Sequence, residues 1–161
     1  SKVYGTNIVV NRLFGPIYGP LQRLYGMFNP RAINYAYNDK ELSIFGRKGL
    51  ESAKDCTYID DQVDAFIKML DYETQFDVFN IGTGNPQSIK TCMEIIEKYL
   101  GKPVKYKIVE VDKGDVASSA DISKARKLLG YEPKMDIEKG IRRQVEIFQL
   151  MPEWYKKMER V

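Results

Sequence analysis

The most informative absence in the sequence is histidine. None of the 161 residues is a histidine, which excludes Ser-His-Asp and Cys-His nucleophile pairs, imidazole general bases and histidine-ligated metal sites. Cysteine is almost as rare, because the chain carries only Cys56 and Cys92. They do not form a CxxC motif, so the sequence predicts no metal site, redox pair or disulfide framework and favours a reducing, cytoplasmic setting.

Long apolar runs and strong charge are also absent. No run approaches the roughly 18 apolar residues that a membrane span needs, and no charged segment followed by an apolar stretch opens the chain. We therefore expect a soluble protein with no membrane partner. The net charge of +3 is small and spread along the chain. It indicates no nucleic-acid partner but suits a small anionic ligand.

Strand-like and helix-like segments alternate along the chain, which indicates an α/β or mixed α+β fold. Apolar and β-branched runs predict strands over residues 7–13, 41–45, 56–59, 76–81 and 104–111. Apolar periodicity and capping residues predict helices over residues 32–38, 89–100 and 123–129 and from residue 136 onward.

A further helix is predicted after Asp60 or Asp61, with one of these aspartates as its N-cap. Its helical spacing predicts a buried face made of Val63, Phe66, Ile67 and Leu70. The segment 15–30 is rich in Gly, Pro and aromatic residues. We interpret it as a long ordered loop that lines a site.

A glycine-rich turn over residues 82–87 stands between a predicted strand and a predicted helix. Such turns can hold a phosphate on backbone N–H groups at a helix N-terminus. The dinucleotide fingerprint needs a third glycine where this sequence has Gln87, and Pro86 removes one amide. We therefore interpret this segment as a structural turn, with phosphate binding as the alternative.

Four aspartates gather around the predicted helix start: Asp55, Asp60, Asp61 and Asp64. Paired carboxylates can act as general acid and base or bind a hard cation, but capping and solvation explain them more simply. Tyr58 is similarly either a phenolic acid/base or a buried strand tyrosine. None of the 11 tyrosines has a lysine four residues later. The sequence therefore contains no identifiable acid-base centre of its own.

Several short motifs follow one another along the chain. They are NRLFGPIYGP from residue 11, SIFG from 43, KDCTYIDDQVDA from 54, FNIGTG from 79, GDV from 114, ADISKA from 120 and LGYEP from 129. Each motif is weak alone, but in this order and spacing they resemble the NAD-dependent nucleotide-sugar epimerase/dehydratase family of extended short-chain dehydrogenases. The resemblance covers essentially the whole chain and only the C-terminal half of a family member.

This resemblance implies the fold class and the domain organisation. The chain would be α/β, the C-terminal part of an NAD(P)-binding Rossmann-type fold, with the last sheet strands and a small mixed α/β domain. Residues 1–30 would end the Rossmann-type domain and form a site-lining loop. Residues 31–161 would form the nucleotide-sugar-binding domain, with some chain crossing back to the Rossmann sheet.

The resemblance also implies what the missing half would supply. In the family, the N-terminal Rossmann half holds NAD and carries the catalytic Tyr-x-x-x-Lys pair. We therefore expect the catalytic residues to precede residue 1 and the chain alone to be an inactive fragment. The partner of this chain would be that N-terminal half, and the intact protein would be a homodimer.

Two groups of ligand-binding residues follow from the resemblance. Phe14 would lie against the nicotinamide end of NAD, and the backbone of Gly15 would approach the cofactor, with a plain strand end as the alternative. Ile44, Phe45 and Gly46 match the segment that packs on a uracil-type base, where stacking on the base competes with packing in the core.

Two charged residues match the part of the family site that holds the rest of the nucleotide. Lys54 stands where the family usually has an arginine on the diphosphate, which keeps the charge but loses the bidentate fork. Asp115 matches a carboxylate that helps bind the ribose or organise the phosphate site, with loop capping as the alternative. The sequence also departs from the family pattern, with one extra residue between Arg12 and Tyr18 and with Gly15 replacing an Asn or Thr.

The function implied by the resemblance is that of an NAD-dependent epimerase. The preferred activity is a UDP-sugar 4-epimerase of the UDP-glucose or UDP-glucuronate type, in which NAD carries the hydride and this chain binds the nucleotide sugar. An NDP-sugar 4,6-dehydratase and a non-catalytic nucleotide-sugar-binding module are the alternatives.

Overall fold

The computed structural model describes residues 4–111 and 118–158, which group into two compact units. The first unit contains residues 4–17, 54–86 and 118–135, and the second contains residues 18–53, 87–111 and 136–158. The predicted boundary between residues 1–30 and 31–161 separates two domains of the longer family fold, which is a different division from these two units. That boundary stays a prediction.

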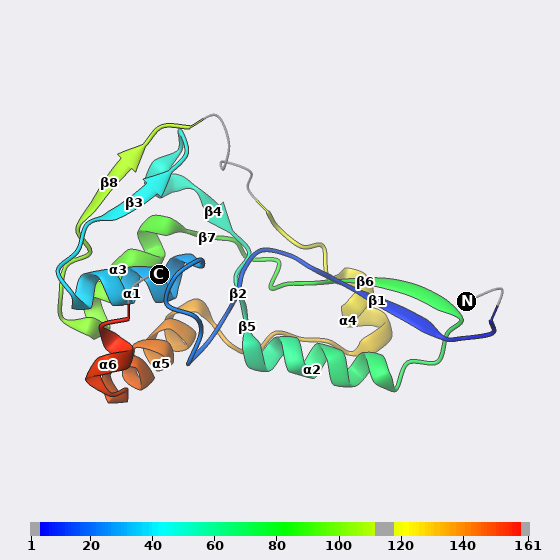
Figure 1. Cartoon of the computed structure of the whole chain (residues 1–161). Coiled ribbons are helices and arrows are strands. Elements are labelled where there is room, and N and C mark those ends of the chain that lie inside the picture. Colours follow the sequence, from blue (N-terminus) through cyan, green and yellow to red (C-terminus); the bar gives the residue numbers. More distant parts are fainter. Residues whose placement is uncertain (1–3, 112–117, 159–161) are drawn as a thin grey trace. The chain divides into compact units, whose positions relative to one another are not determined.

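Both units mix helices with short strands, so the predicted α/β class is confirmed (Figure 1). The first unit contains β1 (Ile8–Leu13), β5 (Thr57–Tyr58), α2 (Ile59–Leu70), β6 (Phe76–Ile81) and α4 (Ser123–Leu129). The second contains α1 (Phe28–Tyr37), β3 (Leu42–Phe45), η1 (Gly49–Glu51), β7 (Gln87–Ser88), α3 (Ile89–Leu100), β8 (Tyr106–Val109), α5 (Ile137–Leu150) and α6 (Glu153–Lys156). The short strands β2 (Ile17–Tyr18) and β4 (Ala53–Lys54) cover two positions where the chain passes from one unit to the other.

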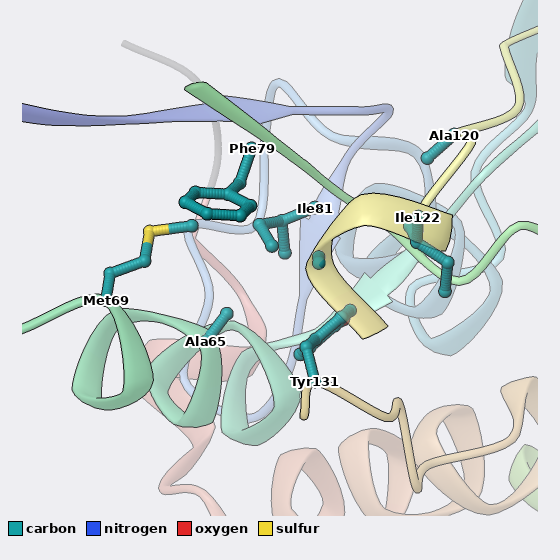
Figure 2. Packing of buried hydrophobic residues seen from close by; sticks show 8 residues of the cluster. Ala65, Met69, Phe79, Ile81, Ala120, Ile122 and Tyr131 are labelled. Carbon is teal, nitrogen blue, oxygen red and sulfur yellow. The ribbon is translucent and has the colours of Figure 1, made fainter. Parts of the chain in front are cut away.

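A parallel strand pair forms the centre of the first unit. β1 pairs with β6 in a register that runs from Ile8 opposite Phe76 to Leu13 opposite Ile81. One face of this pair packs on α2 and α4, and Figure 2 shows Met69 reaching from α2 toward the ring of Phe79. The buried cluster consists of Ala65, Met69, Phe79, Ile81, Ala120, Ile122, Ala125 and Tyr131.

The second unit has its own parallel pair and its own core. β3 pairs with β8 from Leu42 opposite Tyr106 to Phe45 opposite Val109. Helix α3 packs against α1 and α5, and its residue Ile96 is fully buried. The described helices of the two units include none that is long and apolar enough to cross a membrane.

Local signals in the sequence placed several helix ends correctly, but α1 begins at Phe28, inside the segment interpreted as a loop, and not at Ala32. Ser88 caps α3 by accepting a hydrogen bond from the backbone N–H of Thr91, and Gly101 ends the same helix in the left-handed conformation. Asp136 caps α5 in the same way as Ser88 caps α3. The start of α2 was predicted wrongly, because the helix begins at Ile59 and its N-cap is Tyr58, not Asp60 or Asp61.

The buried face of α2 was also predicted wrongly. The stripe of Val63, Phe66, Ile67 and Leu70 is exposed, from 47% at Val63 to 85% at Leu70. The side of the helix that packs on β6 carries Ala65 and Met69 instead. Ala65 has a small side chain, which lets the helix approach the strands closely, and the bulkier stripe faces away from the described core.

The two cysteines differ in their surroundings, which leads to a pH-dependent prediction. Cys92 is buried in α3, and desolvation raises the pKa of its thiol to about 12, whereas Cys56 is partly exposed. Only the thiolate is nucleophilic, and at pH 8 a thiol with this pKa is ionised in about one molecule in 10,000. We expect iodoacetamide at pH 8 to alkylate Cys56 and to leave Cys92 unmodified until urea is added. Equal modification of both tryptic peptides in the folded chain would contradict this prediction.

Candidate functional site

The first unit has one edge where both of its parallel strands end. β1 ends at Leu13 and β6 at Ile81, and the N–H of Phe14 donates to the carbonyl of Ile81 at 3.0 Å. In open α/β sheets, ligands bind just beyond the carboxyl ends of the strands. The segments that leave these two strands, residues 14–15 and 82–84, therefore form the candidate site together with residues 54–55 and 118–120, which contact them. We call this site the carboxyl edge.

Phe14 and Gly15, the residues predicted to approach the cofactor, lie at this edge. The Phe14 side chain is partly buried and packs against the core cluster. Gly15 has φ +64°, and a Cβ atom there would overlap the carbonyl oxygen of Asp55. Only a glycine can lie this close to the Asp55 carbonyl, so the backbones of Gly15 and Asp55 are in close contact at the carboxyl edge. The contact of Phe14 and Gly15 with NAD stays a prediction.

The buried carboxylate of Asp55 links the segments of the carboxyl edge. Its Oδ1 accepts from the backbone N–H of Thr83 at 2.8 Å and from the Thr83 hydroxyl, and its Oδ2 accepts from the N–H of Gly84 at 3.0 Å. The N–H of Ala120 also donates to Oδ2, at 2.9 Å. Asp55 is 0% exposed. The sequence-based interpretation of Asp55 as a capping or solvated residue is therefore wrong.

The other three aspartates of the predicted acidic group do different things. Asp61 accepts from the backbone N–H groups of Lys134 and Met135 at 2.9 and 3.1 Å. Asp64 pairs with Lys68 at 3.0 Å, and Asp60 is exposed. In the part of the chain that the structure describes, no group of three or more His, Cys, Asp or Glu side chains could hold a metal ion.

The Gly82–Thr83–Gly84 segment is a structural turn, as the missing third glycine indicates. The N–H groups of Thr83 and Gly84 donate to Asp55, so they are not presented to an external phosphate. A Cβ atom on Gly82 would lie 2.6 Å from Cβ of Ala120 and 2.7 Å from Oδ2 of Asp55. The turn is therefore packed too closely for any larger residue at position 82.

A buried tyrosine supports the same turn from the core side. The hydroxyl of Tyr131 donates to the carbonyl of Gly82 at 2.9 Å. Burial raises the pKa of this hydroxyl, and the negative charge of Asp61 raises it further. Tyr131 is thus a neutral hydrogen-bond donor that fixes the turn.

Lys54 lies directly before Asp55 and is half-buried. Its backbone forms an isolated parallel bridge with Ser118, which leads to the Asp55-bound residue Ala120. The structure therefore brings Lys54 and Gly15 to one edge of the first unit, around Asp55. The role of Lys54 at a diphosphate stays a prediction.

The residues predicted to pack on a base lie in the second unit, at the end of β3. Strand alternation turns Ile44 into the core, where it is 2% exposed, and leaves Phe45 50% exposed on the opposite face. The N–H of Gly46 donates to the carbonyl of Val109 at 3.1 Å and continues the pairing with β8. The Phe45 side chain is thus accessible, whereas Ile44 could contribute only through its backbone. The contact of this segment with a base stays a prediction.

Asp115, the remaining predicted site residue, lies outside the described residues. The residue that sequence reasoning missed is Asp55, which it had grouped with the capping aspartates. One signal could have found it, since Asp55 directly precedes the strand-like run 56–59, and a charged residue that is buried beside a strand needs a dedicated partner.

Comparisons with known proteins identify relatives of the whole chain. The family model for GDP-mannose 4,6 dehydratase matches residues 1–144. A UDP-glucuronate 4-epimerase from Thermodesulfobacterium geofontis is 43% identical over 148 residues, which are 89% of this chain and 43% of that protein. The chain thus spans about half the length of the curated relatives it matches.

Solved structures of similar proteins show the same fold with ligands bound. The UDP-glucose 4-epimerase of Thermotoga maritima with UDP-glucose has a TM-score of 0.82 at 31% identity, over 92% of this chain and 48% of that one. The UDP-glucuronic acid 4-epimerase of Bacillus cereus with UDP-glucuronic acid and NAD has a TM-score of 0.81 at 33% identity, over 93% and 48%.

Proposed function

The chain belongs to the GDP-mannose 4,6 dehydratase family of NAD-dependent epimerases and dehydratases, and we propose that it is the nucleotide-sugar-binding half of a UDP-sugar 4-epimerase. The proposed substrate is UDP-glucuronate or UDP-glucose. The observation that carries this proposal is the carboxyl edge of the first unit, where Gly15, Lys54 and the turn at Gly82 meet around one buried carboxylate. The 43% identity to a UDP-glucuronate 4-epimerase favours this activity.

Three residues of the chain would each take part in binding the nucleotide. Phe45 presents a half-exposed ring suited to stacking on a uracil-type base. Lys54 would neutralise phosphate charge as a single cation, without the bidentate geometry of an arginine. Asp115 would contribute a carboxylate from outside the described residues.

NAD would be held mainly by the other half of the protein. NAD supplies the hydride chemistry when it is bound. This chain fits a minor part of its site, because the Gly15 backbone lies at the carboxyl edge while the amides of Thr83 and Gly84 are already bonded to Asp55. Phe14 would pack near the nicotinamide through the part of its ring that the core leaves uncovered.

The first unit has an uncovered surface that suits a Rossmann-type N-terminal half. Val9 packs on the core, so strand alternation turns Ile8 and Val10 to the opposite face, where both are exposed. Among the described strands, β6 alone pairs with β1, so one edge of β1 is open to another strand. Together with the exposed stripe of α2, this surface would extend into the sheet and helix layer of the missing half.

Two finer features belong to the same proposal. Cys56 and Cys92 form no disulfide with each other, which agrees with a cytoplasmic protein. The intact protein would be a homodimer, assembled through helices of the N-terminal half.

A 4,6-dehydratase is the second candidate for the activity, because the matching family model carries that description.

The test is to supply the N-terminal half. The chain would be fused to the N-terminal half of the T. geofontis relative and incubated with UDP-glucuronate or UDP-glucose and NAD. We expect the 4-epimer from the fusion and no turnover from the chain alone. A 4-keto-6-deoxy product would favour the dehydratase. Turnover by the purified chain alone would overturn the placement of the catalytic pair, and binding without turnover would favour the non-catalytic module.

Substitutions at Lys54 test the proposed phosphate contact. We expect Lys54→Ala in the fusion to weaken binding of the UDP-sugar about ten-fold, because one charge-assisted contact is lost. Lys54→Arg should bind at least as tightly as the wild type, because it restores the fork. Calorimetric titration measures both, with Lys90→Ala, an exposed lysine of α3, as the matched control. Equal affinities for all four proteins would exclude Lys54 from the site.

A further inference from the structure

Asp55 stands out because it is a completely buried acidic residue at the carboxyl edge. We infer that Asp55 is a positioning residue for nucleotide-sugar binding, which holds the turn at residues 82–84 and the segment at Ala120 in place by hydrogen bonds. This inference rests on the proposed function and assigns a role to a residue that contacts no ligand itself.

The hydrogen bonds of Asp55 join segments that are far apart in the sequence. Thr83 and Gly84 lie 28 and 29 residues after it, and Ala120 lies 65 residues after it. Each carboxylate oxygen accepts two of the four donors. A single side chain therefore fixes the turn after β6 and the segment before α4 relative to Lys54, its own neighbour.

The donor pattern requires a carboxylate. Three of the four donors are backbone N–H groups, which can only donate, so each must face an acceptor. An asparagine amide would place an N–H₂ group against at least one of them in either orientation. A glutamate carries one more methylene, for which the closely packed carboxylate between Gly82 and Ala120 leaves no space.

Close packing on two sides makes this arrangement stiff. Gly82 approaches the Asp55 carboxylate so closely that a Cβ atom would lie 2.7 Å from Oδ2. On the other side, the backbone of Gly15 packs against the Asp55 carbonyl. We therefore expect a change in the carboxylate to affect Gly15 and Lys54, two of the predicted ligand contacts of this unit.

Asp55→Asn provides the test, and Asp61→Asn provides the matched control. Asp61 is also a buried carboxylate of the first unit and accepts two backbone N–H bonds, but from Lys134 and Met135. In the fusion with the N-terminal half, we expect Asp55→Asn to raise KM for the UDP-sugar about ten-fold and to lower kcat less than three-fold. Asp61→Asn should lower the melting temperature and leave KM within two-fold of the wild type.

Amide hydrogen exchange of the 161-residue chain gives a second readout that needs no activity. The N–H groups of Thr83, Gly84 and Ala120 should lose protection at least ten-fold in Asp55→Asn and keep it in Asp61→Asn. Faster exchange with an unchanged KM would overturn the positioning role while leaving the epimerase proposal standing. An inactive wild-type fusion would overturn the proposed function instead, and equal KM changes in both variants would reduce Asp55 to a structural residue.

Discussion

Replacing Phe66 with glutamate is expected to weaken the association of this chain with a Rossmann-type N-terminal half at least 100-fold. Phe66 lies in the middle of the exposed stripe of α2 and is 48% exposed. Large aromatic residues at the centre of an interface contribute most of its binding energy, and a carboxylate buried there without a partner adds a desolvation cost. The dissociation constant of the chain with the separately produced half, measured by calorimetry, would report the loss.

The same substitution should leave the chain itself intact. Phe66 is half-exposed and lies outside the buried cluster, so we expect the substitution to change the free energy of unfolding by only about 0.5 kcal/mol. Leu150→Glu is the matched control, because Leu150 is an exposed apolar residue on a helix of the second unit. We expect that variant to bind the N-terminal half as tightly as the wild type. Equal binding by Phe66→Glu would show that the α2 stripe is not part of the docking surface.

The α2 stripe also shows what the sequence can and cannot predict. The spacing of Val63, Phe66, Ile67 and Leu70 marks an apolar face, but it does not say which neighbour covers that face. In this chain the covered side carries Ala65 and Met69. If the chain docks on an N-terminal half as proposed, the exposed stripe would be the side of α2 that this half covers.

Helix ends were predictable because their signals are local. Ser88 and Gly101 act within one turn of α3, and no distant residue is needed to explain them. Asp55 was not predictable in the same way, since its partners Thr83 and Ala120 lie 28 and 65 residues further along the chain. The α/β class follows from patterns of a few residues. The carboxylate that joins the loops does not.

Gly15→Ala is expected to be among the most destabilising single substitutions in the first unit. Gly15 has φ +64°, a conformation that costs a residue with a Cβ atom about 1–2 kcal/mol. The added Cβ would also overlap the backbone carbonyl of Asp55, which is fixed by the buried side chain of the same residue. We expect a total loss of about 4 kcal/mol in the free energy of unfolding, measured by urea denaturation followed by circular dichroism.

Gly5 separates the two causes, because it has the same φ of +64° and no heavy atom within 4 Å of an added Cβ. Gly5→Ala should therefore cost only the conformational part, about 1 kcal/mol. If both alanine variants lost the same free energy of unfolding, the close approach of Gly15 to Asp55 would make no contribution to the effect of the substitution. A much larger loss at Gly15 would mean that the end of β1 and residue 55 cannot move apart without unfolding. The carboxyl edge would then be preorganised in this half of the protein, before a nucleotide sugar or an N-terminal half is bound.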